Sequence, residues 1–453
     1  MANILLQIFL ILCLVVIIII LFFDKGDYLT YTVIILILAI LVCSLAIPEA
    51  RIVNTYILAI RWEIILFLVC MVISVEILEP FFEELARRIL QKNILNQRIF
   101  FYTLCVFSMF LASVIEDLSV SIIILPFVIK LCRKSEISPL PYLFGVTICL
   151  NLAAAISPFA SAENVLIAND FQLNFIWFFQ NMGLYFLITT IFTLIFLDVF
   201  ILRKNIKTHY TQRLTDEEEH LDLHFASLSL IKEIKEHSTE TPIISRHLFH
   251  ANSTVLVLYF IGLILIENFV LVGIIILLIL TIFNPVGEGT SKKHPDLIFH
   301  AKNADFKLIY FFICFFILET LMELNGIIDM IAEILLTQQN QSIIVLCIIL
   351  MVIVSVLSGL IDDAPVTIIF HPVIVDMLAT YPEYEIPILF AFIIGINIGS
   401  NILPQGAASD LVALEIAQKE RVVGFNYLKL VKVGGLFAIF HVSIAGIFLF
   451  FMI

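Results

Sequence analysis

Two pairs of adjacent acidic residues lie within long apolar stretches of this sequence. Glu116 and Asp117 interrupt residues 98–131, and Asp362 and Asp363 interrupt residues 341–379. An ionisable side chain at the centre of a membrane costs about 3 kcal/mol or more, so such residues usually serve a function. One acid before a helix can cap it, but capping needs one acid per helix and each interruption carries two. The pairs therefore predict a site for a cation or a proton.

Two further apolar stretches, 140–172 and 386–416, are interrupted midway by proline and polar residues. A helix that is unwound inside a membrane frees backbone carbonyls. Together with amide and hydroxyl oxygens, these carbonyls suit a hard cation such as Na⁺, although hydrogen bonding between helices is an alternative role for the Asn side chains. The interruptions supply Asn151, Ser157, Pro158, Ser161, Glu163 and Asn164 in the first stretch, and Asn397, Ser400, Asn401, Pro404, Gln405, Ser409 and Asp410 in the second.

These polar clusters belong to an internal repeat. Residues 112–168 align without gaps to residues 358–414 at a constant offset of 246, which places Asp117 on Asp363 and Asn151 on Asn397. Upstream, at an offset of 243, Glu76 falls on Glu319. Repeats with discontinuous helices are typical of secondary transporters, whose binding sites lie at the repeat interface near mid-membrane.

The interruptions contain no Lys or Arg. Half-helix dipoles can bind anions without basic residues, so an anionic substrate stays an alternative. Adjacent acids resist being charged together in a low dielectric, however, which favours exchange of a proton for a metal cation. No nucleotide-binding P-loop is present, and neither an intramembrane aspartyl protease nor a plain channel would require the mirrored repeat.

The composition places the chain in a membrane. Hydrophobic residues make up 61% and charged residues only 14%, against about 25% charged in soluble domains. The segment 4–23 is too long for a signal peptide and lacks a basic start, so we expect it to be retained. The net charge of −13 does not suggest a nucleic-acid partner, and the eight scattered Cys do not suggest disulfides. Full crossings are expected near 4–23, 28–47, 56–78, 175–200, 251–268, 269–283, 307–324 and 427–453, with shorter amphipathic stretches at 80–92 and 326–337.

Basic residues set the expected topology. With the N-terminus outside, and with 98–131 and 341–379 as re-entrant hairpins, only Arg51 and Arg61 of the 25 basic residues fall outside. The prediction is an all-α membrane protein of two inverted-topology repeats. Each repeat has three scaffold helices, a re-entrant hairpin, a broken helix and a final helix, giving about ten crossings. The expected domains are 1–202, a cytoplasmic linker 203–250 and 251–453, with both termini outside. A metal or pH-sensing role for His220 and His224 in the linker is the less favoured alternative.

The sequence resembles the ion transporter superfamily, which includes NhaD-type sodium/proton antiporters, arsenite permeases, the P-protein type and citrate carriers. The resemblance rests on the helices RWEIILFLVCMVISVEIL and ADFKLIYFFICFFILETL, the turns SVIED and SGLIDDAP, and the segment NLAAAISPFASAENVLIA. It covers nearly the whole chain outside 203–250. This sequence departs from the family pattern in its Glu at 116, its Asp at 117 and 363, its Ser at 161 and its Asp at 410.

The resemblance implies an elevator-like movement of hairpins and broken helices against a scaffold, and it allows a homodimer. It also implies ion binding at Glu116, Asp117, Asn151, Ser157, Asn164, Ser358, Asp362, Asp363, Asn397 and Asn401, with Na⁺ expected at Asp117, Asn151, Asp363 and Asn397. The leading prediction is sodium/proton antiport in the lipid bilayer, with Na⁺ or H⁺ as coupling ion and no cofactor or enzymatic activity. Arsenite or organic-anion transport is the alternative.

Overall fold

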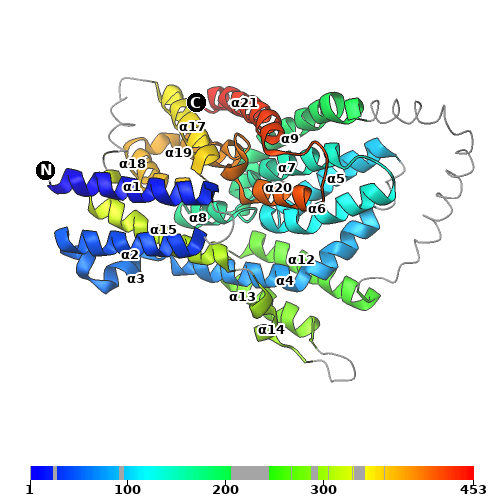
Figure 1. Cartoon of the computed structure of the whole chain (residues 1–453), viewed down its shortest axis with the longest axis horizontal. Coiled ribbons are helices and arrows are strands. Elements are labelled where there is room, and N and C mark those ends of the chain that lie inside the picture. Colours follow the sequence, from blue (N-terminus) through cyan, green and yellow to red (C-terminus); the bar gives the residue numbers. More distant parts are fainter. Residues whose placement is uncertain are drawn as a thin grey trace, which may run out of the picture.

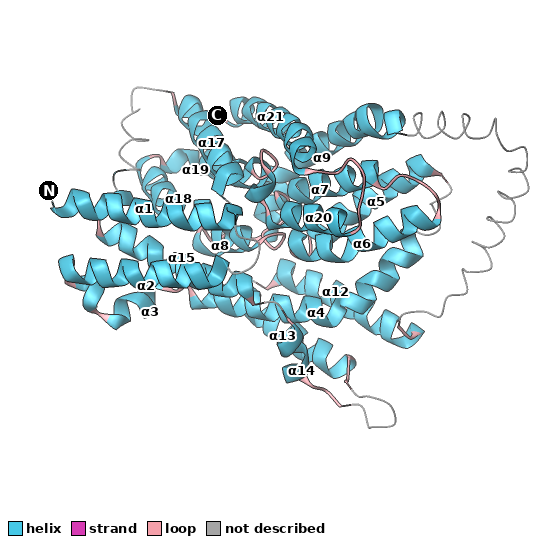
Figure 2. Ribbon diagram, in the orientation of Figure 1, coloured by secondary structure: helices cyan, strands magenta, loops and turns pink. Residues whose placement is uncertain are grey.

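The computed structural model describes residues 2–23, 28–90, 96–205, 244–266, 268–286, 294–304, 306–328, 330, 342–361 and 363–453. Within these ranges every named element is a helix, and the only β contact is an isolated bridge between Val286 and His294. Figure 2 shows this helical architecture. The prediction of an all-α protein is confirmed.

The described part of the first half contains nine α-helices before its π-helical end. In chain order these elements are α1 (Ala2–Phe23), α2 (Tyr28–Ala46), η1 (Glu49–Arg51), α3 (Val53–Ala59), α4 (Trp62–Leu90), α5 (Gln97–Ala112), α6 (Asp117–Lys134), α7 (Leu140–Ala154), α8 (Ala162–Asp170), α9 (Phe175–Leu197) and η3 (Asp198–Leu202). The α5–α6 pair is a helical hairpin, and α7 and α8 are the two parts of a broken helix.

The second half repeats this order. Its described elements are α12 (Arg246–Leu265), α13 (Phe269–Phe283), α14 (Leu297–Asn303), α15 (Lys307–Leu324), α17 (Ile343–Ile361), α18 (Asp363–Thr380), η5 (Pro382–Tyr384), α19 (Glu385–Gly399), η6 (Pro404–Gly406), α20 (Ala408–Lys419) and α21 (Tyr427–Met452). Helices α5 and α17 begin 246 residues apart, as do α6 and α18, and α8 and α20. The repeat seen in the sequence is therefore also a repeat of helix boundaries.

Among the described helices, eight are long and apolar enough to cross a membrane: α2, α4, α9, α12, α17, α18, α19 and α21. Large apolar side chains are exposed along several of them, such as Leu41 on α2 and Ile439 on α21. Extended apolar surfaces of this kind are stable only against lipid or another protein. The chain is an integral, multi-pass membrane protein, whereas the sidedness of its loops stays a prediction from the basic residues.

The boundaries near Pro80 differ from the prediction. Residues 56–78 were expected to cross and 80–92 to form a separate short stretch, but α4 starts at Trp62 and continues through Pro80 to Leu90. A proline removes one helical hydrogen bond, and helices in membranes tolerate this loss when neighbouring helices support the backbone. Here α6 and α13 both pack against α4. Most of the predicted stretch 326–337 and most of the linker 203–250 lie outside the described residues, and α12 already begins at Arg246.

The two halves interlock through their hairpins. Helix α6 packs against α20, and α18 packs against α8, so the second helix of each hairpin contacts the distal part of the other half's broken helix. Figure 1 shows these elements in the middle of the molecule, with α4, α12, α13 and α15 along one side. Residues far apart in the sequence meet at this crossing.

Glycines allow the hairpin helix α17 to approach the second broken helix closely. A Cβ on Gly359 would lie 2.7 Å from the Gly399 carbonyl oxygen, and a Cβ on Gly406 would lie 2.9 Å from the Gly359 Cα. A Cβ on Gly399 would overlap the backbone of Ser355. Backbone atoms cannot move aside as a flexible side chain can, so this contact needs residues without side chains.

We therefore expect Gly399→Ala to destabilise the protein by about 1–3 kcal/mol through overpacking. Helix propensity alone would change stability in the opposite direction, by about 1 kcal/mol in favour of Ala. The measurement is the Tm in detergent. Gly446→Ala is the matched control, because nothing lies within 4 Å of its added Cβ. A Gly399→Ala protein that melts at or above the wild-type temperature would contradict the packing argument.

Candidate ion-binding site

The broken helices place polar groups at the crossing of the two halves. Helix α7 ends at Ala154 and α8 begins at Ala162, where the Ser161 hydroxyl accepts a hydrogen bond from the Asn164 backbone N–H at 3.4 Å. The first hairpin tip is tied to this break, because the Asp117 N–H donates to the Ala160 carbonyl at 3.1 Å. The second break, between Gly399 and Ala408, contains the short helix η6. Both helix breaks predicted from the sequence, within 140–172 and 386–416, are present in the structure.

One cluster of side chains joins the first hairpin tip to the second broken helix. The Ser409 hydroxyl lies 2.8 Å from Asp117 Oδ2 and 3.3 Å from Asn151 Oδ1. Asn151 in turn donates its Nδ2 to Asn401 Oδ1 at 3.1 Å and to Asp410 Oδ2 at 3.3 Å. Two carboxyl groups, from Asp117 and Asp410, are thus connected through one hydroxyl and one amide.

A second cluster lies around the other Asn of the repeat pair. Asn397 donates its Nδ2 to Asn164 Oδ1 at 2.9 Å, and Asn164 donates to the Ser157 carbonyl at 3.1 Å. Beside it, the Ser358 hydroxyl is shared between Asp363 Oδ1 and the Ile396 carbonyl. Asp363 therefore belongs to this cluster through Ser358 and the residue before Asn397.

The two clusters are related by the sequence repeat. The offset of 246 carries Asn151 onto Asn397 and Asn164 onto Asp410. The contact of Asn151 with Asp410 and the contact of Asn397 with Asn164 are therefore equivalent, with the roles of the two halves exchanged. One chemical difference remains between them, since the first contact includes a carboxyl group and the second includes only amides.

Several buried polar atoms at this crossing have no hydrogen-bond partner among the described residues: Asp410 Oδ1, Asn397 Oδ1, Asn401 Nδ2 and Gln405 Nε2. Buried polar atoms are nearly always paired, and exceptions commonly mark the place of a water or an ion. Two of the four atoms are oxygens: Asp410 Oδ1 belongs to the first cluster and Asn397 Oδ1 to the second. A cation at the crossing would give these oxygens the partner that they lack.

The predicted residues do not all converge. Glu116 and Asp117 diverge: Glu116 lines a cavity, whereas Asp117 bonds to Ser409. The Ser157 hydroxyl only accepts from the Phe159 N–H at 3.1 Å, and Asp362 lies outside the described residues. Ser409 and Asp410 were noted among the polar residues of the second break but not chosen for the site. Their alignment opposite Glu163 and Asn164 was the signal that could have selected them.

A cavity of about 1050 Å³ lies beside the first cluster, between α4 and α15 on one side and α6 and α20 on the other. Its lining includes Leu118 and Ser119, which directly follow Asp117 on α6. Charged lining residues of both signs are Glu76, Glu79, Glu116, Lys307, Glu415 and Arg421. Asp117 itself, which directly precedes Leu118 and Ser119, keeps part of its surface exposed.

Comparison with known families identifies the chain. The profile of a family described as citrate transporter matches residues 14–395, which is most of the sequence. This chain belongs to the citrate transporter family. The predicted resemblance to the ion transporter superfamily is thereby confirmed, and the protein is a membrane transporter of that superfamily.

A curated relative of this citrate transporter family member is a putative transporter arsB from Dictyostelium discoideum. The two are 25% identical over 126 residues, which cover 27% of this chain and 22% of the relative. The match thus spans about a fifth of that relative's length. The match agrees with a transporter of the same superfamily, but it does not identify the transported species.

Proposed function

We propose that this protein is a secondary ion transporter that exchanges H⁺ for Na⁺ at the Asp117–Asp410 cluster. The observation that carries the proposal is the link between these two carboxyl groups through Ser409 and Asn151. No Lys or Arg occurs in the hairpin tips or helix breaks to neutralise them. In low dielectric, two such groups need either a proton or a cation to remain close together.

The neutral groups around the carboxyls suit this exchange. The Ser409 hydroxyl has a single proton and two acceptors, Asp117 Oδ2 and Asn151 Oδ1, so one contact is given up whenever the other is made. Carboxylate, hydroxyl and amide oxygens are the ligands that hard cations prefer. A cation bound here would gather these oxygens, and a proton on either carboxyl would replace it. Na⁺ and H⁺ would therefore compete for one site.

For the transport step, the proposal assigns two groups of helices. The hairpins and broken helices, α5–α8 and α17–α20, would move as one body against a scaffold that includes α4 and α15. The cavity supports this division, since it lies between members of the two groups. Sliding of one group along the other would carry the clusters from one side of the membrane to the other.

An organic anion is the second candidate, and the family match favours it. Lys307 and Arg421 both line the cavity and could attract a carboxylate substrate there. In that case the Asp117–Asp410 cluster would bind the cation that accompanies the anion. Arsenite, an alternative from the superfamily resemblance, is also suggested by the name of the partial relative.

Transport into proteoliposomes that contain a pH-sensitive dye tests the proposal. Vesicles preloaded with Na⁺ and diluted into Na⁺-free buffer should acidify inside, because each departing Na⁺ is replaced by entering protons. Choline replaces Na⁺ in the matched control, and Li⁺, citrate and arsenite are tested in parallel. Citrate uptake without any Na⁺-driven acidification would overturn the antiport proposal and support the anion candidate.

A further inference from the structure

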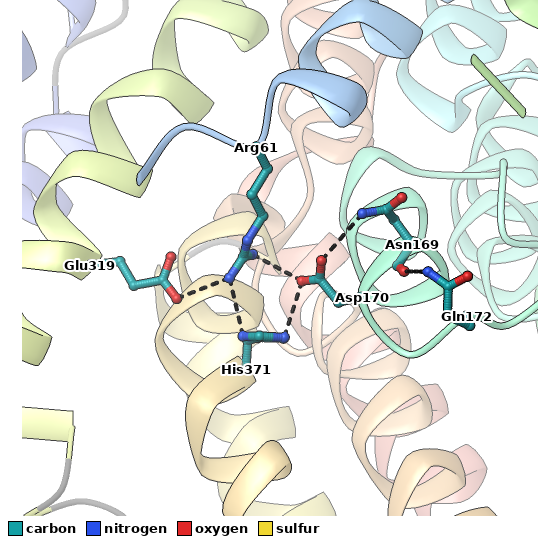
Figure 3. A network of polar contacts seen from close by, with 6 residues as sticks. All are labelled: Arg61, Asn169, Asp170, Gln172, Glu319 and His371. Atoms are coloured by element: carbon teal, nitrogen blue, oxygen red, sulfur yellow. Dashed lines mark hydrogen bonds and ion pairs between the residues drawn. The ribbon is translucent and has the colours of Figure 1, made fainter. Parts of the chain in front are cut away.

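Figure 3 shows a network of charged residues that shares no residue with either cluster. Arg61, just before α4, pairs with Asp170 Oδ2 at 3.1 Å and with Glu319 Oε1 at 3.2 Å. Its guanidinium also lies 3.1 Å from His371 Nδ1, and His371 Nε2 lies 3.1 Å from Asp170 Oδ2. The Phe316 ring, 5.2 Å from the Arg61 guanidinium carbon, covers one face of it.

The geometry fixes the protonation of the histidine in this network. An arginine has no acceptor atom, so His371 Nδ1 must accept the hydrogen bond from Arg61. His371 is then neutral, with its proton on Nε2, which lies close to Asp170 Oδ2. Arg61 is the one positive group facing two carboxyl groups, from Asp170 and Glu319, and its removal would leave two acids without their cation. Breaking a largely buried pair in this way is strongly destabilising.

The network joins the two groups of helices that the proposed function separates. Arg61 directly precedes α4 and Glu319 lies on α15, whereas Asp170 ends α8 and His371 lies within α18. All four side chains are largely buried, with 9–20% of their surface exposed. These contacts must therefore break whenever α8 and α18 slide along α4 and α15.

The network and the cavity lie at different positions along the same two helices, α4 and α15. On α15, Glu319 is in the network and Lys307 lines the cavity, which is about 18 Å along the helix axis. On α4, Arg61 and Glu76 are separated by about 22 Å in the same way. In this structure the charged network closes the interface between the two groups of helices at one position, whereas the cavity leaves it open at another.

A second set of charges lines the cavity, and part of this set corresponds to the network through the sequence repeat. Lys307 is the first residue of α15, and Arg61 directly precedes α4, so both lie at the start of corresponding helices. Glu76 is the repeat partner of Glu319. Glu415 on α20 matches Asn169, the neighbour of Asp170. All three of these charged residues line the cavity.

We propose that the protein has two charge latches that close alternately. The first latch, made of Arg61, Asp170, His371 and Glu319, is closed here and holds the cavity open. The second latch, made of Lys307, Glu76 and Glu415, closes when the moving helices reach the opposite position and the cavity collapses. This inference rests on the proposed movement of the two helix groups and is independent of which ion is carried.

Cysteine labelling tests the first latch without any transport measurement. All eight native cysteines are buried, and Ser119→Cys places a thiol in the cavity. Adding Arg61→Gln should slow maleimide labelling of that thiol at least about threefold, because the open-cavity state loses its latch and its population falls. Arg51→Gln is the matched control, since among the described residues the Arg51 side chain donates to the carbonyls of Ser44 and Leu45, at the end of the preceding helix α2.

Two further variants keep the test decisive. Asp170→Asn should slow labelling as Arg61→Gln does, and it replaces Arg61→Gln if that protein does not fold. Lys307→Gln, in the second latch, should leave the labelling rate of the introduced thiol unchanged or increase it, relative to the protein with Ser119→Cys alone. Unchanged labelling in the first-latch variants, or an equal slowing by Lys307→Gln, overturns the latches. A labelling shift without Na⁺-driven acidification would uphold the latches and reject the ion assignment, and the reverse result would do the opposite.

Discussion

Asp117→Asn is expected to abolish Na⁺-driven acidification of proteoliposomes. The substitution keeps the shape of the side chain, and its amide oxygen can still accept from Ser409, but it removes one of the two charges facing the proposed ion. Unit charges 4 Å apart attract by about 4 kcal/mol at an effective dielectric of 20. Allowing for solvent screening at this partly exposed carboxyl, the apparent Na⁺ affinity should fall at least about a hundredfold.

The control for this variant is Asp376→Asn. Asp376 lies on the exposed surface of α18, far along the helix from Asp363, and its substitution should leave transport at the wild-type rate. The equivalent change in the second half, Asp363→Asn, tests whether both hairpin tips take part. If Asp117→Asn and Asp363→Asn both kept the acidification response, the proposed role of the hairpin tips would be wrong.

Asp410→Asn is expected to uncouple cation binding from proton release. Asp410 is buried and accepts from Asn151, and an Asn can still accept that bond, so the local packing should persist. In the wild-type protein, Na⁺ added to purified protein in weakly buffered detergent should displace a proton from the carboxyl pair. With a single carboxyl left, proton release per Na⁺ should fall by at least about half, as read with a pH indicator.

The Tm and the size-exclusion profile of the Asp410→Asn protein establish that it is folded. Asn164→Asp, at the equivalent position, provides a second comparison, because it adds a carboxyl group beside Asn397 instead of removing one beside Asn151. If Asp410→Asn released as many protons per bound Na⁺ as the wild type, Asp410 would have no part in the exchange.

The sequence allowed most of the framework to be predicted. The offset of 246 located the hairpins and the helix breaks, because the repeat fixes their spacing within each half. The same offset paired Asn151 with Asn397, and both lie in the clusters found in the structure. Apolar length identified the membrane helices, although it missed the continuation of α4 through Pro80, where support from neighbouring helices outweighs the loss of a hydrogen bond.

Contacts between the halves were beyond prediction from the sequence. Nothing in the spacing within one repeat indicates that Asn151 meets Asp410, or that Arg61 reaches Asp170, since both contacts depend on how the two halves dock. The basic residues predicted Arg61 on the outer side, and the sequence did not indicate its contact with His371. Glu116 and Asp117, adjacent in sequence, face different surroundings because α6 begins between a cavity and the crossing.

The difference between Asp410 and Asn164 has an electrical consequence. Each elementary charge moved across a membrane without a counter-ion changes the free energy by about 2.3 kcal/mol per 100 mV. The first cluster contains two carboxyl groups, from Asp117 and Asp410, whereas the second contains one, from Asp363. Moving helices whose carboxyls are empty and ionised would therefore respond to voltage differently from helices that hold Na⁺ or a proton. The membrane potential, and not only the ion gradients, should set which step of the cycle is slow.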